Sequence, residues 1–135
     1  MALSVTDTSV VPVLTGGTFE TLIAGEAITA GQVVYLKGSD SRAYKSDAND
    51  SAKNTVKGIA LNGGATGQPI NVQTGGNVNV GGTLTVGGIY CLSNTAGGID
   101  AFASLSSSDW IVILGYATAA DNLRLMITHT GVQKP

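Results

Sequence analysis

The chain has 135 residues, which is the size of one domain with a single modest core. Only 12% of the residues are charged and the formal net charge is −2, which excludes a basic surface for nucleic acid or acidic lipid. A hydrophobic content of 43% excludes the profile of a disordered chain. The chain contains no run of about 18 apolar residues, which a membrane helix would need. Nineteen glycines with many valines, isoleucines and threonines favour strands joined by tight turns, so we predict an all-β fold.

The N-terminal segment, residues 1–23, differs from the rest of the chain. Two short β-type runs, at 9–14 and 19–23, are separated by glycines, and Pro12 restricts its strand to a sheet edge or an extended arm. We expect an extended arm whose apolar strand is covered by a neighbouring subunit. The segment has no basic region of a secretory signal, and one cysteine forms no intramolecular disulfide, so we expect folding in a reducing cytoplasm.

The remainder, residues 24–135, is expected to form one β domain built from an internal repeat. An offset of 56 residues aligns Ala24 with Val80, and it also aligns glycines, threonines and apolar residues in the same order. We interpret 24–76 and 80–132 as two copies of one supersecondary unit.

Each copy has the same predicted elements. A glycine turn precedes an apolar strand at 33–36 or 89–92, and polar loops at 37–54 and 93–109 contain short strands around 43–44 and 99–102. Another apolar strand begins near Val56 or Trp110, and alternating strands at 68–74 and 122–128 close the units. This pattern predicts a compact β-sandwich or β-barrel, similar to a β-clip.

The chain offers little for catalysis. His129 is its only histidine, no G-x-S-x-G elbow is present, and Cys91 lies in an apolar strand with no positive neighbour to stabilise a thiolate. The loop 47–51 holds closely spaced oxygen ligands but lacks the glycine and glutamate of an EF-hand. The loop 62–68 leads into a strand, as a hairpin turn does and a phosphate loop does not. We expect no catalytic residue, no cofactor and no metal.

The segments "AGEAITAGQVVYL" and "VKGIALNGGATGQPINVQTGG" resemble capsid decoration (cement) and head-fibre proteins of tailed bacteriophages. The resemblance covers residues 20–92 well and the second copy more loosely, and it rests on structural motifs. It implies a structural protein, made in the host cytoplasm, that binds the outside of the assembled head and stabilises contacts between major capsid protein subunits. It also implies a homotrimer or other small oligomer, with no nucleic-acid or membrane partner. The arm residues that it implies as capsid or subunit contacts are Val5, Val10, Val11, Val13, Leu14, Phe19 and Leu22.

Two alternatives remain open. A β-sandwich module that binds carbohydrate or another surface, as part of a phage or bacterial appendage, would expose an aromatic cluster; only Tyr35, Tyr44 and Tyr90 are candidates. An all-β trimeric nucleotide hydrolase would need acidic and basic residues that converge on phosphate and magnesium. The seven cationic residues are scattered without such a motif.

Overall fold

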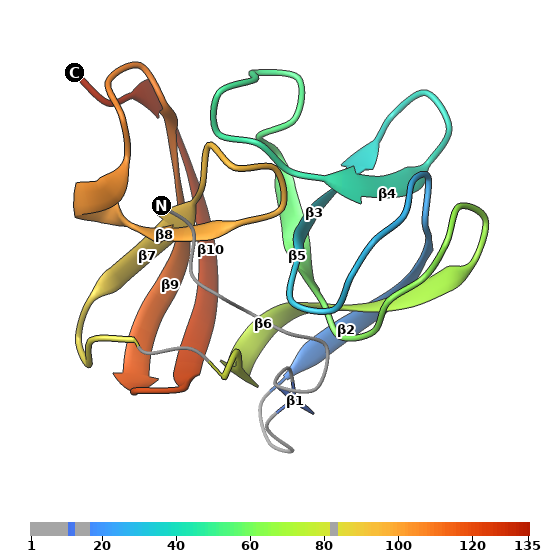
Figure 1. The fold of residues 1–135 in the computed structure, drawn as a ribbon, viewed down its shortest axis with the longest axis horizontal. Helices are drawn as coiled ribbons and strands as arrows, with labels where there is room; N and C mark the ends of the chain where they lie inside the picture. Colours follow the sequence, from blue (N-terminus) through green and yellow to red (C-terminus); the bar gives the residue numbers. More distant parts are fainter. Residues whose placement is uncertain (1–10, 13–16, 82–83) are drawn as a thin grey trace.

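The computed structural model describes residues 11–12, 17–81 and 84–135, and it confirms the all-β prediction. One antiparallel sheet of ten strands curls into a half-barrel, and the described residues contain no α-helix (Figure 1). The strands are β1 (Val11–Pro12), β2 (Thr18–Ile23), β3 (Val33–Lys37), β4 (Arg42–Lys45), β5 (Val56–Ala60), β6 (Pro69–Asn79), β7 (Ile89–Leu92), β8 (Ile99–Ala101), β9 (Trp110–Ala119) and β10 (Asn122–Gln133). A short 3-10 turn spans Phe102–Ser104. No helix in the described ranges has the length and apolarity needed to cross a membrane.

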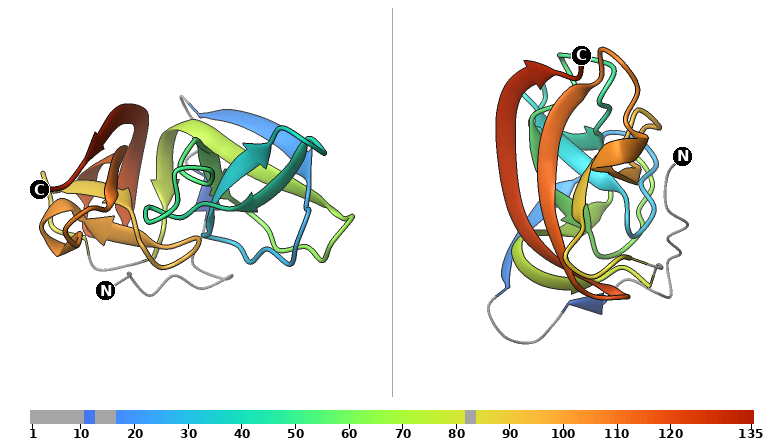
Figure 2. Two further views of the ribbon diagram at one scale, coloured as in Figure 1. Left: turned by 90° about the horizontal axis from the view of Figure 1, so that it is seen from above. Right: turned by 90° about the vertical axis from the view of Figure 1, so that its left-hand side faces the viewer.

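Strand β6 joins the two halves of the sheet. The strand order is β4-β3-β5-β6-β10-β9-β7-β8, and β1 and β2 also pair with β6. The first part of β6 pairs with β2 and β5, whereas its last residues, from Gly76 onward, pair with β10 and β1. The halves therefore lie on opposite sides of β6, as Figures 1 and 2 show.

The strand β6 is longer than the 68–74 expected, because its glycines bend the strand without ending it. Gly76 has a φ of 83°, a conformation that only glycine adopts without strain. The buried amide of Gln73 holds the bend, since its Nε2 donates to the carbonyl oxygens of Gly75 (2.9 Å) and Asn77 (2.8 Å).

The offset of 56 residues that aligns the sequences also aligns backbone hydrogen bonds, with one residue inserted before β9, so that the offset is 57 between β5 and β9. Strand β3 pairs with β4 and β5 as β7 pairs with β8 and β9, and each first strand has a register irregularity at the same place, after Val34 and after Tyr90. In the first half, the Gly31 amide donates to Ala60 O (2.7 Å). In the second half, the Gly87 amide donates to Ala117 O (2.8 Å). The two halves thus contain the same arrangement of three strands and a glycine turn.

The closing strands do not follow the same alignment. Ile59 of β5 pairs with Gln73, and its counterpart Tyr116 of β9 pairs with Arg124, so the structural counterpart of Gln73 is Arg124. The offset of 56 residues would instead match Gln73 with His129. The difference arises because β5 and β6 are joined by a loop at 61–68, whereas only residues 120–121 join β9 and β10.

Two apolar clusters form the core. The smaller one lies in the first half and includes Val34, Ile70 and Val72. The larger one contains Val33 and Ile59 of the first half together with Leu92, Leu114 and other side chains of the second half. The halves therefore share one core.

Candidate binding surfaces

The structure describes only part of the arm residues implied by the resemblance. Val5, Val10, Val13 and Leu14 lie outside the described residues, and of Val11 only the backbone is described, in β1 opposite Asn79. Phe19 and Leu22 are in β2. The expected arm boundary at residue 23 falls within continuous structure, because β2 pairs with β6 from Thr18 to Ile23.

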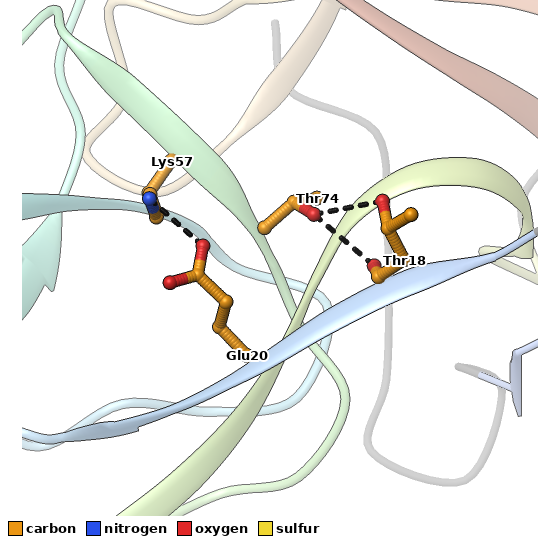
Figure 3. Close-up of polar contacts among 4 residues, drawn as sticks. All are labelled: Thr18, Glu20, Lys57 and Thr74. Carbon is orange, nitrogen blue, oxygen red and sulfur yellow. Dashed lines mark hydrogen bonds and ion pairs between the residues drawn. The ribbon is translucent and has the colours of Figure 1, made fainter.

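Side chains as well as backbone fix β2 to the domain (Figure 3). The hydroxyl groups of Thr18 and Thr74 are 2.9 Å apart, and the Thr74 hydroxyl also donates to the carbonyl oxygen of Thr18 (3.2 Å). Glu20 of β2 forms an ion pair with Lys57 of β5, with 2.8 Å between Oε2 and Nζ (Figure 3). Because both charged groups are exposed, the ion pair orients β2 more than it stabilises it.

Strand β2 presents apolar side chains to solvent. Phe19 is 50% exposed, and Ile23 is also exposed. Leu22 is half-buried and packs against the smaller core cluster. Phe19 is therefore the accessible member of the implied contact set among the residues whose side chains are described.

A second apolar surface lies on the second half, and sequence analysis did not identify it. We call it the outer groove: a depression of about 510 Å³ beside β7 and β8, in which the large exposed side chains are Ile89 and Phe102. Its lining consists of Thr85, Gly88, Ile89, Tyr90, Ala101, Phe102 and Ala103. The exposed ring of Tyr116 follows on β9, where Tyr116 pairs with Ile89.

Cys91 and His129 lie in different surroundings, one buried and one exposed. Cys91 is fully buried, and desolvation together with the charge of Asp100 raises the pKa of its thiol to about 11. It is therefore a protonated core residue at neutral pH. His129 is exposed on β10, beside a depression of about 460 Å³ that is lined by Trp110 and neutral residues.

In the polar loops, side-chain oxygen atoms accept hydrogen bonds from nearby backbone amides. In the loop 47–51, the Asp47 carboxylate accepts from the Asn49 amide (3.1 Å), and the Asp50 carboxylate accepts from the Ala52 amide (2.8 Å). Residues 61–68 form the hairpin loop between β5 and β6, in which the Gln68 side chain accepts from the Ala65 amide (2.7 Å). Across the described part of the chain, no three His, Cys, Asp or Glu side chains gather as metal ligands would.

The three candidate tyrosines do not form one exposed face. Tyr35 and Tyr44 lie on paired strands with ring centroids 6.1 Å apart, but Tyr35 is buried. Tyr90 is buried in the other half, where its hydroxyl accepts from the Thr85 amide (2.8 Å). Only Tyr44 is partly exposed; its hydroxyl donates to Asp40, and Lys37 lies 5.0 Å from its ring centroid.

Comparison with protein-family models and with curated protein sequences finds no match for this chain. The assignment of function therefore depends on the surfaces described above and on the resemblance carried by the glycine-turn motifs.

Proposed function

We propose that this chain is a structural decoration (cement) protein of a tailed-phage capsid. It binds the outside of the assembled head and stabilises contacts between major capsid protein subunits. In this proposal it is made in the host cytoplasm, resides on the outer surface of the virion and needs no cofactor.

One observation carries the proposal: five of the nine exposed large apolar side chains of the described residues lie on two surfaces. Phe19 and Ile23 lie on β2, and Ile89, Phe102 and Tyr116 lie at the outer groove. Exposed apolar patches on a soluble domain mark interaction sites, and binding through them requires no proton transfer or bound metal. A low surface charge suits such contacts, because they then depend little on salt.

We further propose that the protein acts as a homotrimer. A contact between one copy and the shell can be weak, since copies that are joined present the remaining contacts at high effective concentration. The N-terminal segment leads into β2, which is fixed to the domain by Thr18 and Glu20. In this proposal the N-terminal segment contacts a coat subunit while the domain stays folded.

The test is binding to expanded heads that lack the protein, purified from the phage that carries its gene. Deleting residues 1–16 removes only the two-residue strand β1 from the sheet and leaves β2 and its contacts with Thr74 in place, so the domain should stay folded and head occupancy should fall to background. Phe19→Asp should weaken binding in the same assay, whereas Val132→Asp, at a residue that is 53% exposed on β10, serves as the matched control. Unchanged occupancy after the deletion would contradict the proposal.

The carbohydrate-binding alternative predicts an exposed row of aromatic rings. The burial of Tyr35 and Tyr90 leaves Tyr44 alone at its site, which does not favour that alternative.

A further inference from the structure

The two halves have the same backbone pairing but differ in which surface is covered. The alignment of their strand pairing, with an offset of 56 residues that becomes 57 in β5 and β9, places three fully buried residues of the first half on three exposed residues of the second. The pairs are Val33 and Ile89, Ser46 and Phe102, and Ile59 and Tyr116, with exposed fractions of 0% against 45%, 43% and 36%. The outer groove is thus the second-half counterpart of a surface that is buried in the first half.

The cover over the first-half surface is a hairpin of the second half. This hairpin, residues 93–98, joins β7 to β8. The Gly97 carbonyl oxygen accepts from the Val33 amide (2.9 Å), and the Gly97 amide donates to Ser46 O (2.7 Å). Leu92, at the start of the hairpin, is fully buried and shares the larger core cluster with Val33 and Ile59. Besides the pairing of β6 with β10, contact between the halves is therefore made by a hairpin of one unit that lies on the surface of the other.

The first half has the matching hairpin, and it is uncovered. Residues 38–41 join β3 to β4 with the same register as the hairpin of the second half, and all four are exposed. Ser41 (φ 56°) stands at the position of Gly97 (φ 76°), so the two turns share a left-handed residue. Leu36, the counterpart of the buried Leu92, is 40% exposed. One outer groove and one hairpin with its leucine thus remain unmatched in each chain.

We propose that copies of this chain associate head to tail, with Leu36 and the hairpin 38–41 of one copy docked in the outer groove of the next. The contact repeats between chains the one that the halves make within a chain. A heterologous contact of this kind either closes into a ring or continues as a filament, and a closed ring of three copies accords with the proposed trimer. The inference rests on the proposed self-association and is independent of capsid binding.

The experiment measures mass in solution by light scattering during gel filtration, with no capsid present. The native protein should elute at a multiple of the chain mass of 13.6 kDa. Ile89→Asp removes the groove and Leu36→Asp removes the hairpin contact, so each variant alone should be a monomer. Val132→Asp, at an equally exposed apolar residue outside both surfaces, should leave the native mass unchanged.

Mixing the two monomeric variants gives the decisive result. The Ile89→Asp chain keeps an intact hairpin and the Leu36→Asp chain keeps an intact groove, so an equimolar mixture should form a complex of twice the chain mass and nothing larger. Formation of that complex also shows that both variants are folded. A mixture that stays monomeric would overturn the inference, as would a native oligomer that neither variant disrupts; in the latter case self-association itself would stand. A native protein that is monomeric would overturn both the docking inference and the proposed self-association. The capsid proposal would still be decided by head binding in the separate assay.

Discussion

Gly58 and Gly115 occupy equivalent positions in the two halves, and replacement of either by alanine should destabilise the protein. Each lies where a neighbouring strand passes closely. A Cβ on Gly115 would lie 2.8 Å from the carbonyl carbon of Arg124 and overlap its oxygen. A Cβ on Gly58 would meet Gln73 in the same way, 2.8 Å from its carbonyl carbon. The obstacle is backbone in both cases, so it cannot rotate away as a flexible side chain would.

The magnitude follows from that rigidity. Overpacking against backbone costs about 3 kcal/mol, at the upper end for a small insertion. The lower entropy of alanine in the unfolded chain returns about 0.5–1 kcal/mol, which leaves a loss of about 2 kcal/mol. With an unfolding entropy of about 0.28 kcal/mol/K for a chain of this length, Tm should fall by about 7 °C.

Thermal unfolding at one fixed protein concentration measures the effect, because self-association makes Tm depend on concentration. Gly38→Ala is the matched control, since no atom of its own chain lies within 4 Å of its added Cβ. Because Gly38 belongs to the proposed docking hairpin, the variants are compared in the monomeric Ile89→Asp background, where Gly38→Ala should leave Tm unchanged. If Gly115→Ala and Gly38→Ala unfold at the same temperature, the two sheet glycines are not required by close approach and the reasoning is wrong.

Three further predictions concern single side chains. In the monomeric Ile89→Asp background, Leu92→Ala should cost about 2–5 kcal/mol of unfolding free energy in urea titrations, because it opens a cavity in the core, whereas Leu36→Ala at the equivalent exposed position should cost well under half as much. Cys91 should react with a thiol reagent at pH 8 only after unfolding. The pKa of its thiol is raised from 9.0 to about 11 in the folded protein, so native stability should fall as pH rises from 9 to 11. Cys91→Ala should make the stability less dependent on pH in that range. The Tyr44 hydroxyl lowers the pKa of Asp40, so Tyr44→Phe should raise that pKa in an NMR titration. Since a lowered carboxyl pKa stabilises the fold above its unfolded value, Tyr44→Phe should destabilise the protein at pH 7 and lose this effect as the pH falls below the Asp40 pKa. An unchanged Asp40 titration would show that the hydroxyl does not control the carboxylate.

Alternation and glycine position were sufficient to locate most strands. The run from Val33 to Leu36 was predicted as an apolar strand, and Val33 and Val34 are buried in different core clusters. Leu36 is exposed, and the register irregularity after Val34 is where the simple alternation ends. The length of β6 was underestimated because a Gly-Gly pair reads as a turn, although here the Gln73 amide holds a bent strand together.

Of the two candidate surfaces, the one on β2 was anticipated before the structure and the outer groove was not. Phe19 was named among the contacts that the resemblance implies, whereas the proline and glycines of the sequence indicated only that its strand belongs to a peripheral segment. The outer groove was missed, since the alignment of Ile89 with Val33 shows that the two positions correspond and does not show which one is covered. Leu36 and Leu92 are likewise indistinguishable by local pattern.

By itself the sequence determined the all-β class, the approximate positions of the strands and the offset between the two halves, because side-chain alternation and glycine turns act over a few neighbouring residues. Only the tertiary structure decided how β6 joins the halves, which counterpart of Gln73 is correct, and which of two equivalent surfaces is buried. Burial of a surface requires a second element to lie on it, and in this chain that element, the hairpin at 93–98, stands some sixty residues away from the strand that it covers.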